Sequence, residues 1–416
     1  MREMKDSGIE WIGEIPKDWE ITKIGMLYNL RITKVSDTDY APLSVTKMGV
    51  LPQLETVAKT NAHDDRKLVK KGDFVINSRS DRRGSCGISD YYGSVSLINI
   101  VLEPKNNMSS GYYSCLFKTV QFADEFYKNG HGIVDDLWTT GWQDMKRIIL
   151  PVPHYSEQQQ IANYLDTKCS EIDATVEDIQ KEITLLEDYK KSVITEAVTK
   201  GLNPDAEMKD SGIEWIGEIP KYWKVDKIKY HLKRNEPKNP GNAIVLSVYR
   251  DYGVIPKDSR DDNHNVTSED TSKYKYVKKG QLVINKMKAW QGSLAVSDYD
   301  GIVSPAYFIY DFIDEEYNHK YFHYLVRSCY KEEFKRISGG IREGQWDLST
   351  EGFSNTMVLL PSIEEQNEIL DYILQKEMEI DSLIADKKRQ LDILADYKKS
   401  LIYEYVTGKK EVPVNE

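Results

Sequence analysis

The chain has 416 residues, 30% of them charged, and a formal net charge of -11. Its length allows two or three domains with apolar cores. Its acidity argues against a protein that coats nucleic acid through bulk charge, although local basic patches remain compatible with it. The four cysteines are scattered without a CxxC pair, which argues against a zinc cluster or a disulfide framework and suits a reducing cytosol. The N-terminus lacks a signal peptide and no apolar run approaches a membrane span, so we predict a soluble, cytoplasmic protein.

The strongest pattern in the sequence is an internal repeat. The peptide MKDSGIEWIGEIPK occupies positions 4–17 and returns unchanged at positions 208–221. Shorter matches follow in the same order in both copies, and the last is Tyr-Lys-Lys-Ser at 189–192 and 397–400. Between these matches the copies differ heavily. The chain is therefore predicted to contain two copies of one unit, which share a scaffold but carry different surfaces.

Each copy begins with a mixed zone, at about 17–155 and again at about 221–361. Short apolar runs after turn signals predict strands, and helical spacing of aromatic and aliphatic residues predicts helices. From this pattern we predict a globular α/β or α+β domain with a twisted sheet. The strands are expected at 74–76, 97–102, 148–152, 303–310 and 357–360, and the helices at 112–128 and 317–337.

Each copy ends in one long predicted helix. From Ser156 to about residue 199 there is neither Gly nor Pro, and apolar residues recur every seven positions. Ser156 is the expected N-cap and Gly201 the expected stop. Charged residues interrupt the second helix at Glu377, Lys387 and Lys398. The predicted interface residues are Leu165, Ile172, Ile179, Leu186 and Val193 in the first helix and Ile373, Ile380, Ile384, Leu391, Leu394 and Leu401 in the second.

A helix of about 65 Å with one apolar stripe needs a partner, because a domain of this size cannot cover it. The alternative is an amphipathic helix that lies on its own domain. We favour pairing between the two copies, so that two globular domains are joined by an antiparallel two-helix coiled coil with pseudo-twofold symmetry. The predicted boundaries are 1–155 for the first domain, 156–201 for the first helix, 202–361 for a linker and the second domain, 362–408 for the second helix and 409–416 for a tail.

The sequence carries no catalytic motif that withstands inspection. Neither a GxGxxG nor a GxxxxGK[ST] loop is present. His319 and His323 have the i, i+4 spacing of zinc ligands on a helix, but Lys320 stands where a zincin has its Glu base. A solvated or core pair is the better interpretation of these histidines. We therefore predict no catalytic residue and no metal ligand in this chain.

Basic residues instead gather at matching places in the two copies. Residues 271–297 contain six lysines, interleaved aromatic residues and no acidic residue. Such side chains neutralise phosphates and read base edges, whereas the alternative is a solvated charged hairpin. Further candidates lie near Lys47 and Arg250, and after the Gly-Gly turn at 339–340. The predicted DNA-binding residues are Lys47, Arg79, Arg82, Arg83, Tyr249, Arg250, Lys286, Lys288, Trp290, Gln291, Arg342 and Gln345.

The chain resembles the specificity (S) subunit of type I restriction-modification systems over essentially its whole length. The resemblance rests on the repeated SGIEWIGEIPK peptide with the tryptophans that follow it, Trp19 and Trp223. It also rests on the two Glu-Gln helix starts, on the Tyr-Lys-Lys-Ser helix endings and on TKGLNPD at 199–205. We expect the identical peptide to serve the joint between each domain and the helices, and specificity to lie where the copies disagree.

The resemblance implies two target-recognition domains, each of which reads half of a bipartite site in double-stranded DNA, and a helical spacer that fixes the number of unread base pairs. It implies no catalysis in this chain. Two modification subunits would methylate adenine with S-adenosylmethionine, and restriction subunits would use ATP and Mg. Because the recognition zones differ in sequence, we expect an asymmetric target. Two other hypotheses remain: a stand-alone DNA-modifying or cleaving enzyme, and a coiled-coil scaffold without a DNA role.

Overall fold

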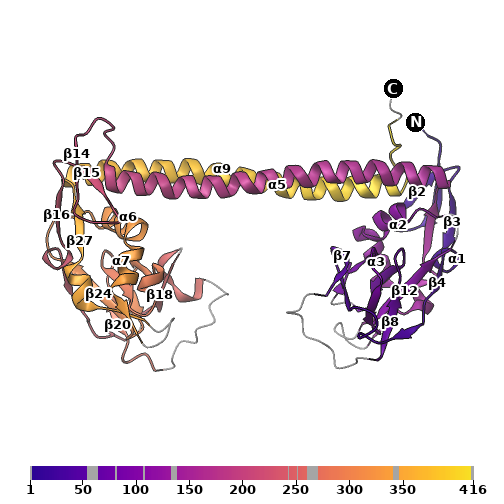
Figure 1. Ribbon diagram of the computed structural model, residues 1–416, viewed down its shortest axis with the longest axis horizontal. Helices are drawn as coiled ribbons and strands as arrows, with labels where there is room; N and C mark the ends of the chain where they lie inside the picture. Colours follow the sequence, from indigo (N-terminus) through magenta and orange to yellow (C-terminus); the bar gives the residue numbers. More distant parts are fainter. Residues whose placement is uncertain are drawn as a thin grey trace. The chain divides into compact units, whose positions relative to one another are not determined.

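The computed structural model consists of two compact units that interleave the two copies of the repeat (Figure 1). The first unit comprises Met1–Gln180 and Lys388–Glu416, and the second comprises Lys181–Lys387. Each unit holds one mixed domain, the beginning of one long helix and the end of the other. The predicted boundaries divide the chain into consecutive segments, whereas the first compact unit combines two segments that are far apart in the sequence. The structure describes residues 2–53, 64–79, 82–105, 108–132, 138–241, 243–250, 252–259, 270–340 and 346–413.

The mixed domain of the first unit is built on a four-stranded sheet with the order β10-β9-β12-β4, in which all ladders are antiparallel. The short helices pack against it around a core of aromatic side chains. The elements are β1 Met4–Ile9, β2 Gly13–Pro16, β3 Glu20–Lys23, α1 Ile24–Leu27, β4 Tyr28–Leu30, β5 Lys34–Val35, β6 Leu43–Thr46, β7 Gly49–Pro52, β8 Arg66–Val69, β9 Phe74–Asn77, β10 Cys86–Ile88, β11 Gly93–Ser96, β12 Asn99–Pro104, α2 Ser110–Phe117, α3 Val120–Lys128, α4 Trp142–Met145, β13 Ile149–Val152 and α5 Tyr155–Lys200.

The second unit repeats this topology, with the sheet order β17-β24-β21-β22. The predicted duplication and the α+β domain are therefore confirmed. The elements are β14 Met208–Asp210, β15 Glu218–Pro220, β16 Lys224–Lys227, η3 Ile228–Tyr230, β17 Leu232–Arg234, β18 Leu246–Tyr249, β19 Gly253–Pro256, η4 Lys257–Ser259, β20 Lys275–Val277, β21 Leu282–Asn285, η5 Ala289–Gln291, β22 Leu294–Val296, β23 Gly301–Val303, β24 Tyr307–Phe312, α6 His319–Cys329, α7 Lys331–Arg336, β25 Ser338–Gly339, β26 Asp347–Leu348, α8 Thr350–Asn355, β27 Met357–Leu360 and α9 Ile363–Val406.

Four sequence-based element predictions need correction. The predicted strand at 303–310 is two strands, β23 and β24, because the chain turns between them. The predicted helix at 112–128 breaks before α3, where the Thr119 side chain accepts a hydrogen bond from the backbone of Phe122 and so starts a new helix. The helix predicted at 317–337 likewise divides at Tyr330. Ser156 is not an N-cap, because α5 already begins at Tyr155.

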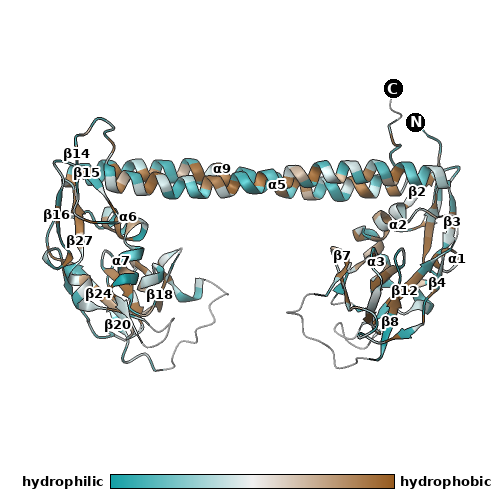
Figure 2. Cartoon of the chain, in the orientation of Figure 1, coloured by the Kyte–Doolittle hydropathy of each residue, from teal (hydrophilic) through white to brown (hydrophobic). Residues whose placement is uncertain are grey.

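The two long helices run antiparallel in each unit. In the first unit the Tyr164 ring of α5 lies 4.7 Å from the Tyr405 ring of α9. Further along α5, Asp173 pairs with Lys398, which precedes Tyr405 in α9, so the two helices run in opposite directions. Apolar and polar residues alternate along both helices (Figure 2). The predicted interface residues are all buried or half-buried: Leu165, Ile172, Ile179, Val193, Ile373, Ile380, Ile384 and Leu401 are buried, and Leu186, Leu391 and Leu394 are half-buried.

The charges that interrupt the heptad pattern are paired across the helices. Lys190 lies 2.9 Å from Asp381 and 3.2 Å from Glu377. Burial lowers the pKa of the Lys190 ammonium, but the hydrogen bond to Asp381 and the charge of Glu377 outweigh that effect and raise it overall. In the first unit Lys398 and Asp173, the repeat equivalents of Lys190 and Asp381, are 2.5 Å apart. The same Lys–Asp pair thus sets the register of the helices in both units.

Lys190→Ala is expected to destabilise the protein by about 1–3 kcal/mol, because Glu377 and Asp381 would be left close together without their cation. Lys398→Ala serves as the matched variant and is expected to cost about 1 kcal/mol or less, since only Asp173 loses a partner there. Urea-induced unfolding of both variants measures the difference. Equal losses would contradict the role given to Glu377.

The duplicated peptide forms the joint between each domain and the helices, as expected from the sequence. The indole Nε1 of Trp19 donates to Glu157 of α5, and that of Trp223 donates to Glu365 of α9, both at 2.9 Å. Both tryptophans are fully buried. The end of the other helix reaches the same joint, where the hydroxyl of Tyr112 donates to the backbone carbonyl of Val406 at 2.7 Å. The tryptophan that follows the duplicated peptide therefore makes the same contact to a long helix in both units.

Two glycines end the long helices. Gly201 and Gly408 follow α5 and α9 with φ of 71° and 72°, which a side chain would strain, so the predicted stop at Gly201 is confirmed. None of the helices in the described part of the chain combines the length and apolarity that a membrane span requires.

Candidate nucleic-acid interface

A β-hairpin presents a basic residue at its tip in both units. The hairpin β6–β7 of the first unit and the hairpin β18–β19 of the second share the pattern Leu-Ser-Val before the tip and Gly-Val-X-Pro after it. The tip begins with Thr46 and Lys47 in one copy and with Tyr249 and Arg250 in the other. Both Lys47 and Arg250 are exposed. The two copies therefore keep the backbone of this hairpin and change the side chains at its end.

A second conserved feature of the repeat is the loop that follows the central strand of each sheet. In the second unit it connects β21 to β22 and contains the short helix η5. The side chain of Asn285 accepts from the backbone of Met287 at 3.2 Å. The Trp290 indole donates to the Met287 carbonyl at 3.1 Å, and its ring lies 5.5 Å from that of Trp346. These contacts fix the loop and leave Lys288 exposed.

The hairpin and the loop of the second unit meet at an open cleft of about 170 Å³. Four predicted DNA-binding residues from two distant sequence stretches converge there: Tyr249 and Arg250 from the hairpin, and Lys288 and Gln291 from the loop. A guanidinium nitrogen of Arg250 lies 3.5 Å from the Gln291 amide oxygen. Among the described residues, the lining of this cleft includes no carboxylate. A cleft lined by two cations, two side-chain amides and two phenols suits phosphate and base-edge contacts.

The structure separates Lys286 from this group. Its ammonium lies 2.9 Å from the carboxylate of Asp347, and its backbone carbonyl accepts from Leu348 at 2.9 Å. Lys286 therefore fastens β26 to the loop, which the basic pattern of the sequence did not indicate. Arg342 and Gln345 lie outside the described residues.

Sequence reasoning missed the side chains behind the cleft. Arg327 of α6 donates to the carbonyl of Arg250 at the hairpin tip and, at 2.8 Å, to the carbonyl of Leu294 in β22. One turn earlier, His323 accepts from the backbone of Val296 at 3.2 Å. Burial lowers the pKa of His323 to about 3, so this half-buried ring is neutral, whereas His319, the other member of the i, i+4 pair, is exposed. A basic residue on a mostly buried helix face was the only sequence signal for Arg327.

In the first unit the predicted arginines occupy the loop between β9 and β10. Arg79 is exposed, and its backbone forms an isolated antiparallel β-bridge with that of Thr139. Arg83 pairs with Asp124, and its guanidinium lies 5.0 Å from the centre of the Tyr127 ring. Arg82 is exposed beside them. Arg79 and Arg83 flank a narrow pocket lined by Phe117, Phe122, Phe126, Tyr127 and Trp138. Matching loops in the two units thus present different polar groups.

Comparison with known proteins agrees with this repeated arrangement. A family model described as the type I restriction modification DNA specificity domain matches residues 16–185 and 220–392. The specificity subunit of the type I restriction enzyme MjaVIII from Methanocaldococcus jannaschii is 25% identical over 433 residues, covering 96% of this chain and 94% of the relative. The putative MjaX specificity subunit from the same organism is 25% identical over 238 residues, covering 51% and 52%.

Two solved structures share the fold. A chain from a study of complex assembly and conformational transition of the type I R-M system superimposes with a TM-score of 0.67 at 12% identity, covering 95% of this chain and 99% of that chain. The HsdS subunit from Thermoanaerobacter tengcongensis superimposes with a TM-score of 0.54 at 12% identity, covering 95% and 98%. With a family model matched once in each copy and over most of its length, the chain belongs to the type I restriction modification DNA specificity family.

Proposed function

We propose that this chain selects the DNA target of a type I restriction-modification complex. The observation that carries the proposal is that both units keep the same hairpin and loop but present different polar side chains, Lys47 in one and Arg250 in the other. Sequence is read by side-chain contacts to base edges, whereas the frame that holds the side chains is indifferent to sequence. One frame with two sets of side chains suits two different half-sites.

Each domain would read one half of a bipartite site in double-stranded DNA, and the target would be asymmetric. Two identical readers related by a twofold axis select a palindrome. The hairpin tips of the two units differ in residue type and length, and the loops differ in residue type, so their preferred bases should differ as well. The overall acidity of the chain confines DNA attraction to these local basic surfaces.

The chain would contribute no catalysis of its own to the complex. In this proposal, two modification subunits bind S-adenosylmethionine and methylate adenine, and restriction subunits use ATP and Mg to translocate and cleave DNA. The family to which the chain belongs and the lack of catalytic motifs in its sequence support this division of labour. A stand-alone modifying or cleaving enzyme and a scaffold without a DNA role are the competing functions.

The proposal is tested by mapping methylated adenines in the genome of the source cell with and without this gene. We expect one bipartite, asymmetric motif to disappear when the gene is deleted. The purified chain, incubated with DNA and labelled S-adenosylmethionine, should transfer no methyl group until the modification subunit is added. Transfer by the chain alone would establish the enzyme instead, and an unchanged methylation pattern would favour the scaffold.

We further propose that α5 and α9 act together as a ruler between the half-sites. Inserting one heptad after Gln180 and a matching heptad after Lys387 lengthens both helices by about 10.5 Å, at 1.5 Å per residue. This corresponds to about three base pairs at 3.4 Å each. The methylated motif is expected to gain about three unread base pairs while both half-sites stay the same. An unchanged spacing in a folded, active variant would refute the ruler.

A further inference from the structure

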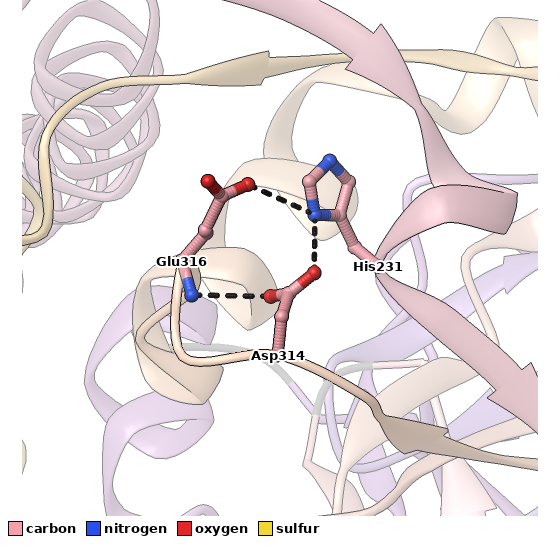
Figure 3. A group of neighbouring side chains, drawn as sticks. All are labelled: His231, Asp314 and Glu316. Atoms are coloured by element: carbon pink, nitrogen blue, oxygen red, sulfur yellow. Dashed lines mark hydrogen bonds and ion pairs between the residues drawn. The ribbon is translucent and has the colours of Figure 1, made fainter.

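A histidine and three carboxylates meet near the joint of the second domain with α9. His231 follows η3, and Asp314 and Glu316 lie in the turn between β24 and α6 (Figure 3). The imidazole Nδ1 is 2.8 Å from Asp314 Oδ2 and 3.7 Å from Glu316 Oε2. On the other side of the ring, Nε2 is 3.5 Å from Asp226 Oδ2 in β16. The ring itself is buried, with 2% of its surface exposed.

A neutral imidazole cannot satisfy these surroundings. It carries one N–H, and with the proton on Nδ1 the ring donates to Asp314 but turns the lone pair of Nε2 toward Asp226. In this structure the buried Nε2 has no hydrogen-bond partner among the described residues. With the proton on Nε2, the lone pair of Nδ1 faces Asp314 at 2.8 Å instead. Either tautomer places a buried lone pair against a carboxylate, which is costly away from water.

The conflict disappears when a cation sits between Nδ1 and the two carboxylates. His231, Asp314 and Glu316 each offer one ligand atom, and these three atoms all lie within 4.8 Å of one another. They are therefore close enough to share one ion. The proton then moves to Nε2 and points at Asp226. A ligating histidine that donates its other N–H to a carboxylate is the usual outer-shell arrangement of metal sites. Asp226 lies on the side of the ring where such a partner belongs, 3.5 Å from Nε2 but without a hydrogen bond to it.

We propose that His231, Asp314 and Glu316 bind a divalent transition-metal ion of the Zn²⁺ type, with water completing its coordination. A set of one imidazole nitrogen and two carboxylate oxygens is suited to Zn²⁺, whereas Mg²⁺ and Ca²⁺ prefer oxygen ligands throughout. Asp314 and Glu316 are 28% and 58% exposed at the side chain, so an ion can enter from solvent. Asp226 orients the histidine without touching the ion.

The metal would act as a structural clip rather than as a catalyst. It would connect the residue that precedes β17 to the 314–316 turn. That turn is already tied to the long helix, because the side chain of Gln366 in α9 donates to the Glu316 carbonyl at 2.7 Å. The first unit has no matching histidine: Leu27 holds the equivalent place, as its carbonyl accepts from Lys105 just as that of His231 accepts from Ile313. The clip therefore belongs to one copy.

Zinc titration of the full-length, tag-free protein by calorimetry tests the site, with Mg²⁺ as the control ion. We expect one Zn²⁺ per chain, a raised melting temperature with Zn²⁺ and no response to Mg²⁺. Glu316→Gln should weaken Zn²⁺ binding at least tenfold, while Glu315→Gln, an exposed neighbour outside the cluster, should bind as the wild type does. Asp226→Asn should weaken it by about 10- to 100-fold, as outer-shell changes do.

His231→Leu introduces the residue of the first copy and should abolish binding. Glu316→Gln keeps the proposal testable should the leucine variant fail to fold, because Glu316 is exposed. Replacing Zn²⁺ with Co²⁺ should give a spectrum without thiolate charge-transfer bands, which separates this site from the cysteines. The absence of stoichiometric Zn²⁺ binding would overturn the proposal. Binding that Glu316→Gln leaves unchanged would overturn it as well.

Discussion

Replacing Arg250 and Lys288 with Ala is expected to abolish recognition of one half-site and to leave the other half-site intact. Both cations line one cleft of the second unit, together with Tyr249 and Gln291. A good base contact is worth about 1–3 kcal/mol, so losing two of them should weaken binding to the cognate target by about thirtyfold to more than ten-thousandfold. Both side chains are exposed and should be replaced without loss of fold.

The measurement is competition binding by the assembled complex on DNA in which either half-site is scrambled. The double variant should bind equally well to the wild-type target and to a target with its own half-site scrambled. Lys47→Ala is the matched change in the first unit and should affect the opposite half-site. Lys286→Ala, whose ammonium is held by Asp347, should leave base preference unchanged. Uniform weakening on all sequences, with a salt slope reduced by about one per residue, would identify phosphate contacts instead.

Trp223→Ala is expected to destabilise the second unit by about 3–5 kcal/mol, the usual cost of deleting a buried tryptophan. The indole is buried and donates to Glu365 Oε2 at 2.9 Å, so the change leaves a cavity and removes one donor from a carboxylate that keeps, among the described residues, only the Tyr222 hydroxyl, on Oε1. Trp19→Ala should have the same effect in the first unit, where the contact to Glu157 is identical. In chemical denaturation, Trp223→Ala should lower the midpoint of the transition of the second unit, and Trp19→Ala should lower that of the first unit.

Trp215 provides the control, since it belongs to the duplicated peptide that precedes Trp223 but is 37% exposed. Replacing Trp215 with Ala removes mainly its edge contact to Tyr330, whose ring centre lies 5.8 Å from that of Trp215. The cost should be about 0.5–1.5 kcal/mol for such an aromatic pair. Equal destabilisation by Trp215→Ala and Trp223→Ala would show that the joint is not held by the buried indole.

The features that were predictable from sequence are those in which one physical constraint repeats many times. The seven-residue spacing from Leu165 to Val193 applies the same burial requirement at every second turn, so it survives local exceptions. The position of the two domain–helix joints followed from the duplicated peptide. The basic residues of the hairpin and loop could be proposed individually, but only the fold brings Arg250 and Lys288 to one cleft.

What escaped sequence reasoning depends on single long-range contacts. Lys286 reads as one more member of a basic run, yet Asp347 neutralises it from a separate strand. His231 and Asp314 are 83 residues apart and match no spaced ligand motif, so their approach becomes visible only once β17 and β24 pair. The helix start at Tyr155 rather than at Ser156 is a shift of one residue, which pattern reasoning cannot resolve.

The interleaving of the two units sets an order in which the chain can fold during synthesis. The second unit is one continuous segment, Lys181–Lys387, and can close as soon as that segment has left the ribosome. The first unit is made early but stays incomplete, because Tyr112 and Trp11 contact Val406 and Tyr403, which are translated last. The domain synthesised first is therefore the one that finishes folding last, and until then its joint is exposed to chaperones and proteases.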